Sequence, residues 1–401
     1  MPNDLSTKLD NLDAKLDRMW LHLDFLRTRL TTYLGDGIAL TYLLDETPIF
    51  VNSNDFGGPA NFVNGGRYEE ENLEVLLSFV ESNTVFLDIG ANLGFFSLQI
   101  GRRITRHGKV LAFEPHPRLI ELFRRSAFLN GLSHAITCFP FGLSSTDASV
   151  EFKYPIGHLG GGSLLHSSDT AVTIVKSEVK RLDSALAQDF SCDLVKIDVE
   201  GHEIDVLRGM TRVIEKSPRI KILFEKLSTD VGTELALEGF FQDVGFELYT
   251  VHGDSSLRPL SVGHLKDWSG YVLAARPGEI TELKRSRFQI SASQLNTPGK
   301  TVPPGGNLAT SGENGQVLFH GPYWFLRRGV WQLVLHGSIE GDMSVTIAER
   351  FGYKVTDFTL AGTNSTHQFI AERDLVQFEC VGRAAGRTAL NLSKLELIRV
   401  G

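Results

Sequence analysis

The sequence has few cysteines, no long hydrophobic run and no excess of positive charge. Its three cysteines, Cys138, Cys192 and Cys380, lie far apart, so we expect neither a disulfide framework nor a zinc site, and their scarcity fits a reducing, cytoplasmic compartment. No stretch approaches the roughly 20 apolar residues that span a bilayer, and the charged N-terminus lacks the apolar core of a signal peptide. A formal net charge of −8 disfavours non-specific binding to nucleic acid. The 401 residues leave room for two or three globular domains.

A heptad pattern fills the first segment of the chain. Apolar residues alternate at spacings of four and three, at Leu5, Leu9, Leu12, Leu16, Met19, Leu23, Leu26, Leu30 and Tyr33. A repeat of about 3.5 residues makes a narrow apolar seam that needs a partner helix. We therefore predict that residues 5–33, within a segment 1–34, form a coiled coil that makes the protein a homo-oligomer. The alternative is an amphipathic helix folded back on its own chain, and leucine at both seam positions leaves the number of strands open.

Residues 85–94 predict a buried strand, a glycine turn and the start of a helix. The apolar run Val85-Phe86-Leu87 leads into Asp88, and Gly90 and Gly94 follow. Such a turn lies at the carboxyl end of a strand, where open α/β sheets bind ligands. Because glycine has no side chain and tolerates positive φ, the turn lets a ligand approach the backbone.

The charges around this turn indicate the kind of ligand. Asp88 lies just before a Gly-x-x-x-Gly spacing, and a carboxylate there repels phosphate but suits a sulfonium or ammonium group. Glu114 ends a second apolar run, at a position suited to accept hydrogen bonds from ribose hydroxyls. Together they predict an S-adenosylmethionine site, whereas the alternative is an ordinary α/β turn with a solvated glutamate. The predicted cofactor-binding residues are Asp88, Gly90, Ala91, Asn92, Gly94, Glu114 and Pro115.

Four motifs resemble those of the FkbM family of S-adenosylmethionine-dependent methyltransferases. They are Asp-Ile-Gly-Ala-Asn-Leu-Gly at 88–94, Phe-Glu-Pro-His-Pro at 113–117, Leu-Asn-Gly at 129–131 and Lys-Ile-Asp-Val-Glu-Gly-His-Glu at 196–203. The resemblance extends over about residues 70–250. It implies methylation of hydroxyl groups, often on sugars or sugar-like natural products.

Strand and helix patterns alternate through this region. Strands are predicted at 85–87, 110–113, 135–140, 193–198, 219–225, 246–251 and near 270–275, with helices at 69–81, before Asn130, after Glu203 and near 233–244. Such alternation predicts a parallel sheet with right-handed crossovers. We therefore predict an α/β fold for residues 35–284, a seven-stranded Rossmann-like class I methyltransferase domain. Thr41 to Phe50 fits a strand or a short helix, and Asn52 to Gly66 fits a loop, more a connector than a lid.

The motif at 196–203 holds the candidate catalytic residues. Lys196 and Asp198 share one face of a strand, and Glu200 and His202 follow in the turn. Buried charges are costly unless paired, so a Lys–Asp pair at a cleft favours function, although a structural ion pair is the alternative. We predict Asp198, Glu200 or His202 as base or acceptor-orienting group, with Lys196 stabilising the developing alkoxide. Glu225 is a further candidate, but no compelling metal-ligand set accompanies it.

Residues 141–182 form a long insertion with a glycine-rich stretch. His158 and His166 flank this stretch, and the family has a Gly-Ser stretch near its active site. Each histidine is therefore either a substrate contact or a surface loop residue.

The character of the chain changes after Pro277. Short strand patterns recur every ten or so residues with turns between them and no clear helix, which predicts a β-sandwich for residues 285–401. Three aromatic residues gather within 321–326, where they either stack on sugar rings or pack in the core.

The predicted function is S-adenosylmethionine-dependent O-methylation of a hydroxyl on a sugar, a glycan or a glycan precursor. Two rival interpretations remain. One is a nucleotide-dependent oxidoreductase on a similar sheet, against which Asp88 and the glycine spacing argue. The other is a non-catalytic carbohydrate-binding or scaffolding protein built on the coiled coil and the sandwich.

Overall fold

The computed structural model describes residues 15, 19, 31–66, 68–162, 172–227, 231–261, 263–280, 287–303, 305–349 and 352–400. Most of the predicted coiled coil lies outside these residues, so the coiled coil and the homo-oligomer stay predictions. Its last predicted position is wrong, because Tyr33 lies in a strand, β1 (Thr32–Gly35), with its side chain exposed. In the described part of the chain, no helix has the length and hydrophobicity to cross a bilayer.

A small antiparallel sheet begins the described fold. β1 is followed by β2 (Ile38–Tyr42) and β3 (Pro48–Asn52), so the strand interpretation of Thr41 to Phe50 is confirmed. The predicted loop at 52–66 is wrong in part, because it contains the helix α2 (Gly58–Gly65). The sheet packs on helix α5 (Pro117–Leu129), where Asn130 Nδ2 donates to the Pro48 carbonyl at 2.8 Å. Asn130 of the Leu-Asn-Gly motif thus joins two parts of the fold.

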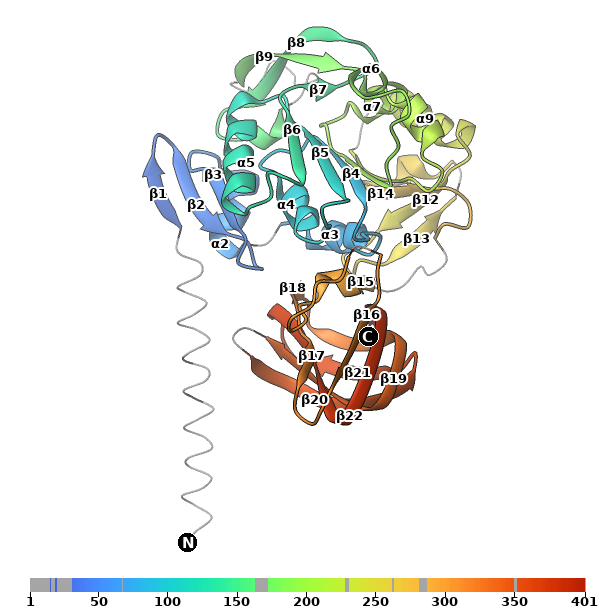
Figure 1. The fold of residues 1–401 in the computed structure, drawn as a ribbon. Coiled ribbons are helices and arrows are strands. Elements are labelled where there is room, and N and C mark those ends of the chain that lie inside the picture. Colours follow the sequence, from blue (N-terminus) through green and yellow to red (C-terminus); the bar gives the residue numbers. More distant parts are fainter. Residues whose placement is uncertain are drawn as a thin grey trace.

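An eight-stranded sheet forms the centre of the molecule (Figure 1). Its order is β13-β12-β14-β11-β10-β4-β5-β6, with β4 (Val85–Ile89), β5 (Lys109–Phe113), β6 (Ile136–Phe139), β10 (Leu194–Ile197), β11 (Lys221–Lys226), β12 (Glu247–Val251), β13 (Leu257–Leu260) and β14 (Gly270–Ala275). The seven predicted strands are all present. β13 adds an eighth strand that we did not predict, because residues 257–260 pair antiparallel with β12. β14 runs antiparallel to both β11 and β12, whereas β11, β10, β4, β5 and β6 are mutually parallel.

Helices cover both faces of this sheet. One face packs on α3 (Glu70–Leu77), α4 (Phe95–Gly101) and α5, and the other on α7 (Glu203–Arg208), α8 (Thr211–Lys216) and α9 (Val231–Asp243), with the short α6 (Leu182–Ala185) beside α8. Phe86 and Leu87 are neighbours in β4 and lie in different hydrophobic clusters, as the two-residue side-chain period of a strand requires. Burial on both faces explains why the strands are continuous apolar runs.

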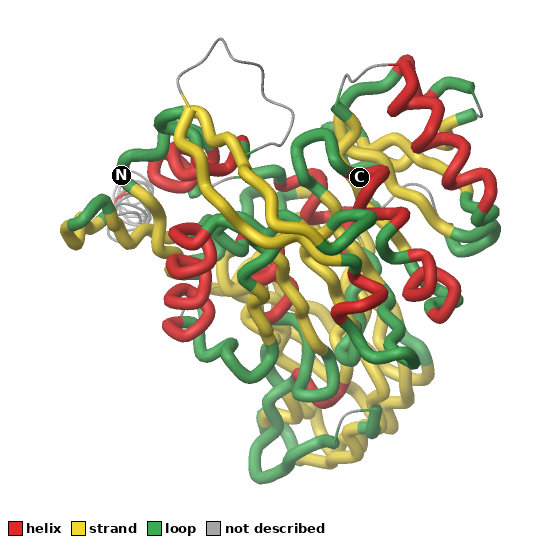
Figure 2. The backbone as a smooth tube through the Cα atoms, turned by 90° about the horizontal axis from the view of Figure 1, so that it is seen from above, coloured by secondary structure: helices red, strands yellow, loops and turns green. Residues whose placement is uncertain are grey.

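The long insertion folds as a three-stranded sheet. It contains β7 (Gly142–Leu143), β8 (Ala148–Pro155) and β9 (Val172–Lys180), with the short helix η1 (Leu159–Gly161) after β8. Seen from above, the long β8–β9 pair crosses the end of the central sheet (Figure 2). His166 lies outside the described residues.

The C-terminal part is all β, with η2 (Leu265–Asp267) before it in the chain and η3 (Ala292–Gln294) within it. Its strands are β15 (Arg287–Ser291), β16 (Leu308–Gly312), β17 (Val317–Phe319), β18 (Pro322–Leu326), β19 (Gly329–Glu349), β20 (Tyr353–Thr363), β21 (Thr366–Ala371) and β22 (Leu375–Arg399). We expected two sheets of short strands, but hydrogen bonds join these strands into one sheet centred on the long strands β19 and β22. A Cβ at Gly337 would lie 2.0 Å from the Asn391 carbonyl oxygen, so the irregular crossing of β19 and β22 requires glycine there.

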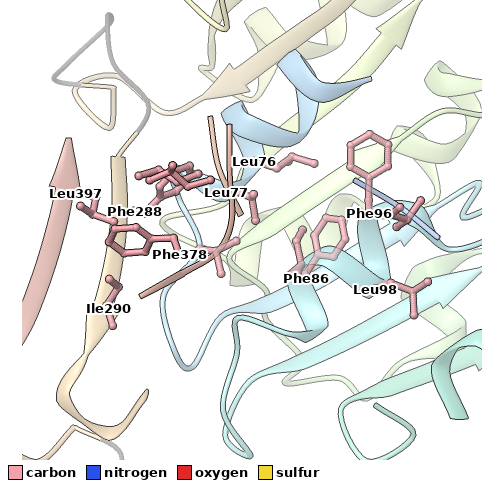
Figure 3. Close-up of a cluster of buried hydrophobic side chains, with 14 of the residues drawn as sticks. Leu76, Leu77, Phe86, Phe96, Leu98, Phe288, Ile290, Phe378 and Leu397 are labelled. Carbon is pink, nitrogen blue, oxygen red and sulfur yellow. The ribbon is translucent and has the colours of Figure 1, made fainter. Parts of the chain in front are cut away.

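The C-terminal part shares its core with the central domain. Leu76 and Leu77 of α3 belong to the same cluster of buried side chains as Phe288 and Phe378 (Figure 3). The aromatic group at 321–326 contributes to this junction, since Trp324 lies against the Arg103 guanidinium, 5.3 Å from its ring centre. This contact favours packing over sugar stacking as the role of Trp324, whereas the side chain of Tyr323 is exposed.

Candidate active site

A cavity opens where β4, β5 and β10 end. Its lining includes four segments: the glycine turn with Gly90 and Asn92, the end of β5 with Glu114 and Pro115, the end of β10 with Asp198, Glu200 and His202, and the insertion with Phe152, Tyr154, His158 and Val179. The structure therefore brings together the two regions that the sequence predicted separately. Of the two interpretations of His158, the structure supports the one that places it at the site.

Packing within the protein accounts for the two glycines of the turn. Gly90 has φ +76°, and a Cβ there would lie 1.8 Å from the Asp198 carbonyl oxygen. Gly94 has φ +81°, and a Cβ there would lie 2.1 Å from the ring of Phe123. We predicted that glycine is needed here so that a ligand can approach the backbone, but packing within the protein also requires it. At Gly94 this requirement comes from Phe123 of helix α5.

Glu114 joins the end of β5 to the glycine turn. Its Oε2 accepts a hydrogen bond from the Asn92 amide and its Oε1 from the His116 amide, both at 2.8 Å. Burial raises the pKa of Glu114 to about 7. A carboxylate has about four lone-pair sites, so Glu114 can also accept from ribose hydroxyls in the cavity. This geometry fits the predicted ribose contact.

Asp88 lies behind the turn and is not among the residues that line the cavity. It is fully buried, and its Oδ2 accepts hydrogen bonds from the hydroxyl of Ser97 at 2.6 Å and from the Ser97 amide at 3.2 Å. Its Oδ1 has no hydrogen-bond partner among the described residues. Burial raises the pKa of Asp88, against the opposing charge of Lys196. Asp88, which we predicted to bind the cofactor, therefore supports the glycine turn from behind in this structure.

Lys196 and Asp198 form a buried ion pair beside the cavity. The Lys196 Nζ lies 3.0 Å from Asp198 Oδ2 and donates to the Gly90 carbonyl at 3.2 Å. Burial alone would lower the pKa of Lys196, but Asp198 and Asp88 outweigh it and hold that pKa above its usual value. Only Asp198 of the pair reaches the cavity wall, so Lys196 is placed to fix Asp198 and the glycine turn.

The environment of Asp198 keeps it ionised. Burial would raise its pKa, but the charge and hydrogen bond of Lys196, together with hydrogen bonds from Tyr271 and Glu225, outweigh burial and lower that pKa. The Tyr271 hydroxyl also donates to Asp198 Oδ2 at 2.9 Å. A carboxylate held this firmly in its charged form is a poor proton acceptor, and it is better suited to orient a hydroxyl group.

Glu200 has the properties of a general base at neutral pH. It lines the cavity, and burial, followed by the charges of Asp198 and Glu203, raises its pKa to about 7. Its backbone has φ +55°, a conformation that costs energy for a residue other than glycine and is frequent at functional sites. His202 also lines the cavity, and its Nε2 is buried without a hydrogen-bond partner among the described residues.

Two other residues near the predicted family motifs serve the architecture. The Oε1 of Glu203 accepts from the amides of Gly201 at 3.1 Å and Val199 at 3.3 Å, so it closes its own turn. Asp183 accepts from the Arg212 amide at 3.0 Å and the Val213 amide at 3.1 Å. Asp183 thus satisfies backbone donors in the first turn of α8.

The structure adds site residues that the sequence did not indicate. Glu69, Tyr68 and Tyr271 surround Asp198, and Tyr68 also lines the cavity. Glu225, an earlier candidate, joins them, and burial with the nearby Asp198 charge raises its pKa to about 9. Glu69 stands in a run of three glutamates that resembles an ordinary helix start, so no local signal identified it. Among the described residues, no group of three or more His, Cys, Asp or Glu side chains is arranged to hold a metal ion.

This fold and site define a class I methyltransferase domain with a Rossmann-like sheet. Residues 88–248 match the family model described as the methyltransferase FkbM domain. This chain therefore contains an FkbM methyltransferase domain, and its cofactor is S-adenosyl-L-methionine. The buried Glu114 and the turn that it fixes fit that cofactor.

Three relatives show the extent of the similarity. The chain is 28% identical over 198 residues to "Methyltransferase sdnD" of Sordaria araneosa, covering 42% of this chain and 75% of that one. It is 31% identical over 150 residues to "Methyltransferase 1" of Beauveria bassiana, covering 32% and 59%. It is 27% identical over 149 residues to "Hexuronic acid methyltransferase AglP" of Haloferax volcanii, covering 37% and 59%.

Proposed function

We propose that the protein is an O-methyltransferase that acts on a hydroxyl of a sugar, a glycan or a glycan precursor. The observation that supports this most strongly is Glu200, a cavity-lining carboxylate with a pKa of about 7. Transfer to a hydroxyl requires a group that takes the hydroxyl proton as the oxygen attacks, and such a base works best with a pKa near the operating pH. A neutral amine attacks through its lone pair and needs no such base.

The residues of the cavity suggest a division of labour. When bound, S-adenosylmethionine would supply an electrophilic methyl group, whose bond to the sulfonium sulfur breaks so that the electron pair goes to sulfur and neutral S-adenosylhomocysteine leaves. Asp198, held ionised by Lys196 and Tyr271, accepts a hydrogen bond from the acceptor hydroxyl and orients it. Glu200 takes the hydroxyl proton as the O–H bond breaks and the new O–C bond forms, and later releases this proton to solvent. Holding the oxygen in line contributes to rate because the reactants are already aligned.

A carbohydrate acceptor is supported by two observations. The relative from Haloferax volcanii is named a hexuronic acid methyltransferase. The acceptor side of the cavity also presents several hydrogen-bonding side chains, Tyr68, His158, Asp198, Glu200 and His202. Closely spaced polar groups of this kind suit a compound with several hydroxyls, since each buried hydroxyl then finds a partner.

The test is a search for the acceptor with methyl-labelled cofactor. A panel of neutral sugars, sugar acids, amino sugars, nucleotide sugars and glycans is incubated with the full chain, and products are located by NMR. We expect a methyl ether on a sugar hydroxyl. Glu200→Gln should lower kcat by about 10²–10⁴-fold, the range typical of a general base.

The matched control is Glu178→Gln, which alters an exposed glutamate of β9 paired with Lys180. It should leave kcat unchanged. Methylation of an amine instead of a hydroxyl, or full activity in Glu200→Gln, would refute the proposal.

A further inference from the structure

Helix α3 connects the C-terminal part of the protein to the acceptor side of the cavity. Glu69 caps the start of α3 in a left-handed conformation with φ 42°. Its carboxylate accepts a hydrogen bond from Asn72 Nδ2 at 3.0 Å and is hydrogen-bonded to Tyr68 and Tyr271. Tyr271 in turn donates to Asp198. One residue, Tyr271, therefore separates Glu69 from the residue that we assign to orient the acceptor.

Arg327, the residue directly after β18, contacts the turns of α3 that follow Glu69. Arg327 Nη2 lies 2.6 Å from Glu70 Oε2, and its Nη1 lies 3.2 Å from Glu74 Oε2. Arg399 adds a longer contact with Glu74, at 3.7 Å. All of these side chains are largely buried, where ion pairs are screened less by salt than on the surface. One guanidinium thus bridges two carboxylates on successive turns of the helix that begins at Glu69.

We propose that Glu69 is a positioning residue for the methyl transfer, acting through Tyr68 and Tyr271 on Asp198, and that Arg327 of the C-terminal part holds Glu69 in place. The C-terminal part then completes the acceptor site. This inference rests on the proposed O-methyl transfer. It also explains why Glu69 keeps a strained left-handed backbone, because both flanks of the residue are fixed by contacts.

The charges around Glu69 agree with this role. Asp198 and Lys196 approach it from β10, Glu225 from β11 and the Tyr271 hydroxyl from β14. Three carboxylates and a single lysine are thus close together. Where like charges are this near, a small displacement of one carboxylate changes the charge state of the others.

The experiment compares Glu69→Gln, Arg327→Met and the double variant Glu69→Gln/Arg327→Met in the full chain. The probe is the acceptor that the sugar panel returns. We expect each single variant to lower kcat about tenfold, within the range seen for residues that act through a network, with the KM for S-adenosylmethionine unchanged. If Arg327 acts through Glu69, the double variant should be no slower than Glu69→Gln alone. Multiplied losses in the double variant would overturn the proposal.

The control is Arg373→Met, which breaks an ion pair with Glu349 inside the C-terminal part, away from α3. Hydrogen exchange of the segment 68–77 should speed up in Arg327→Met and stay unchanged in Arg373→Met. This measurement needs no acceptor, so it tests the contact even if no sugar is methylated. Equal exchange in the two variants would refute the role of Arg327. If Arg327→Met does not fold, Arg327→Lys is used in its place. It keeps the positive charge but cannot bridge both carboxylates as the planar guanidinium does, so it should give a smaller change in the same direction.

Discussion

The Asp198 carbonyl oxygen lies 1.8 Å from the position that a Cβ on Gly90 would occupy. The two residues directly follow adjacent parallel strands, Gly90 after β4 and Asp198 after β10, and both strands end at the cavity. The glycine turn and Asp198, which we propose to orient the acceptor, are thus fixed against each other through the backbone.

The first prediction concerns this contact. Gly90→Ala should lower the free energy of unfolding by more than about 2 kcal/mol, because positive φ and a backbone clash add together. Gly131→Ala is the matched control, since Gly131 has φ +69° with open space around it, and it should cost only about 1 kcal/mol. Urea unfolding monitored by circular dichroism provides the comparison. Equal losses would show that the contact with Asp198 is unimportant.

The second prediction separates the two acidic residues of the cofactor site. Glu114→Gln should weaken S-adenosylmethionine binding by about tenfold, because it removes a charge-assisted acceptor from the cavity wall. Asp88→Asn should weaken it less, since Asp88 lies behind the turn. Calorimetric titration of each variant measures this, and the reverse order would place Asp88 in contact with the cofactor.

The third prediction is a pH profile. If Glu200 is the base, it must be deprotonated, so kcat/KM should fall as pH drops below about 7, the pKa of this group. Glu114 and Glu203 also have pKa values of about 7, so the assignment requires a variant. In Glu200→Gln, the kcat/KM of the residual activity should no longer fall as pH drops below about 7. If kcat/KM of this variant still fell in the same way, the decrease would belong to another group.

The fourth prediction concerns stability and the charge of Glu203. Burial raises its folded-state pKa to about 7, above the ordinary value of 4.5. The folded state therefore binds this proton more tightly, and the resulting stability is complete below about pH 4.5 and lost as pH rises through 7. Glu203→Gln keeps an acceptor for the Gly201 amide and should make this pH dependence less steep, while Glu114 and Glu200 maintain the rest of it. Unfolding free energies measured from pH 5 to 8 would test it, and an unchanged slope would contradict it.

The fifth prediction concerns the buried ion pair. Lys196→Met leaves Asp198 and Asp88 without their nearest cation and should destabilise the fold by about 3–5 kcal/mol. Lys196→Met/Asp198→Asn removes one of the uncompensated charges and should recover part of the loss. Thermal and urea unfolding of both variants measure this. A double variant less stable than Lys196→Met would show that Asp198 does not depend on Lys196.

The sequence alone determined the cofactor half of this protein. The strand, the glycine turn and the acidic residue that ends the next strand are local patterns, and parallel strands bring their carboxyl ends to one edge, so Asn92 and Glu114 could be placed together without coordinates. The sequence also indicated Lys196, Asp198 and Glu200, because they lie at or just after the carboxyl end of another strand of the parallel sheet.

Only the tertiary structure revealed which other residues surround Asp198. Glu69, Tyr271 and Arg327 come from a helix start, an antiparallel strand and the C-terminal part, and their proximity depends on long-range packing that no local period records. The structure also placed Asp88 and Lys196 behind the cavity wall, because whether a charged side chain faces a ligand or the core depends on the elements that cover it.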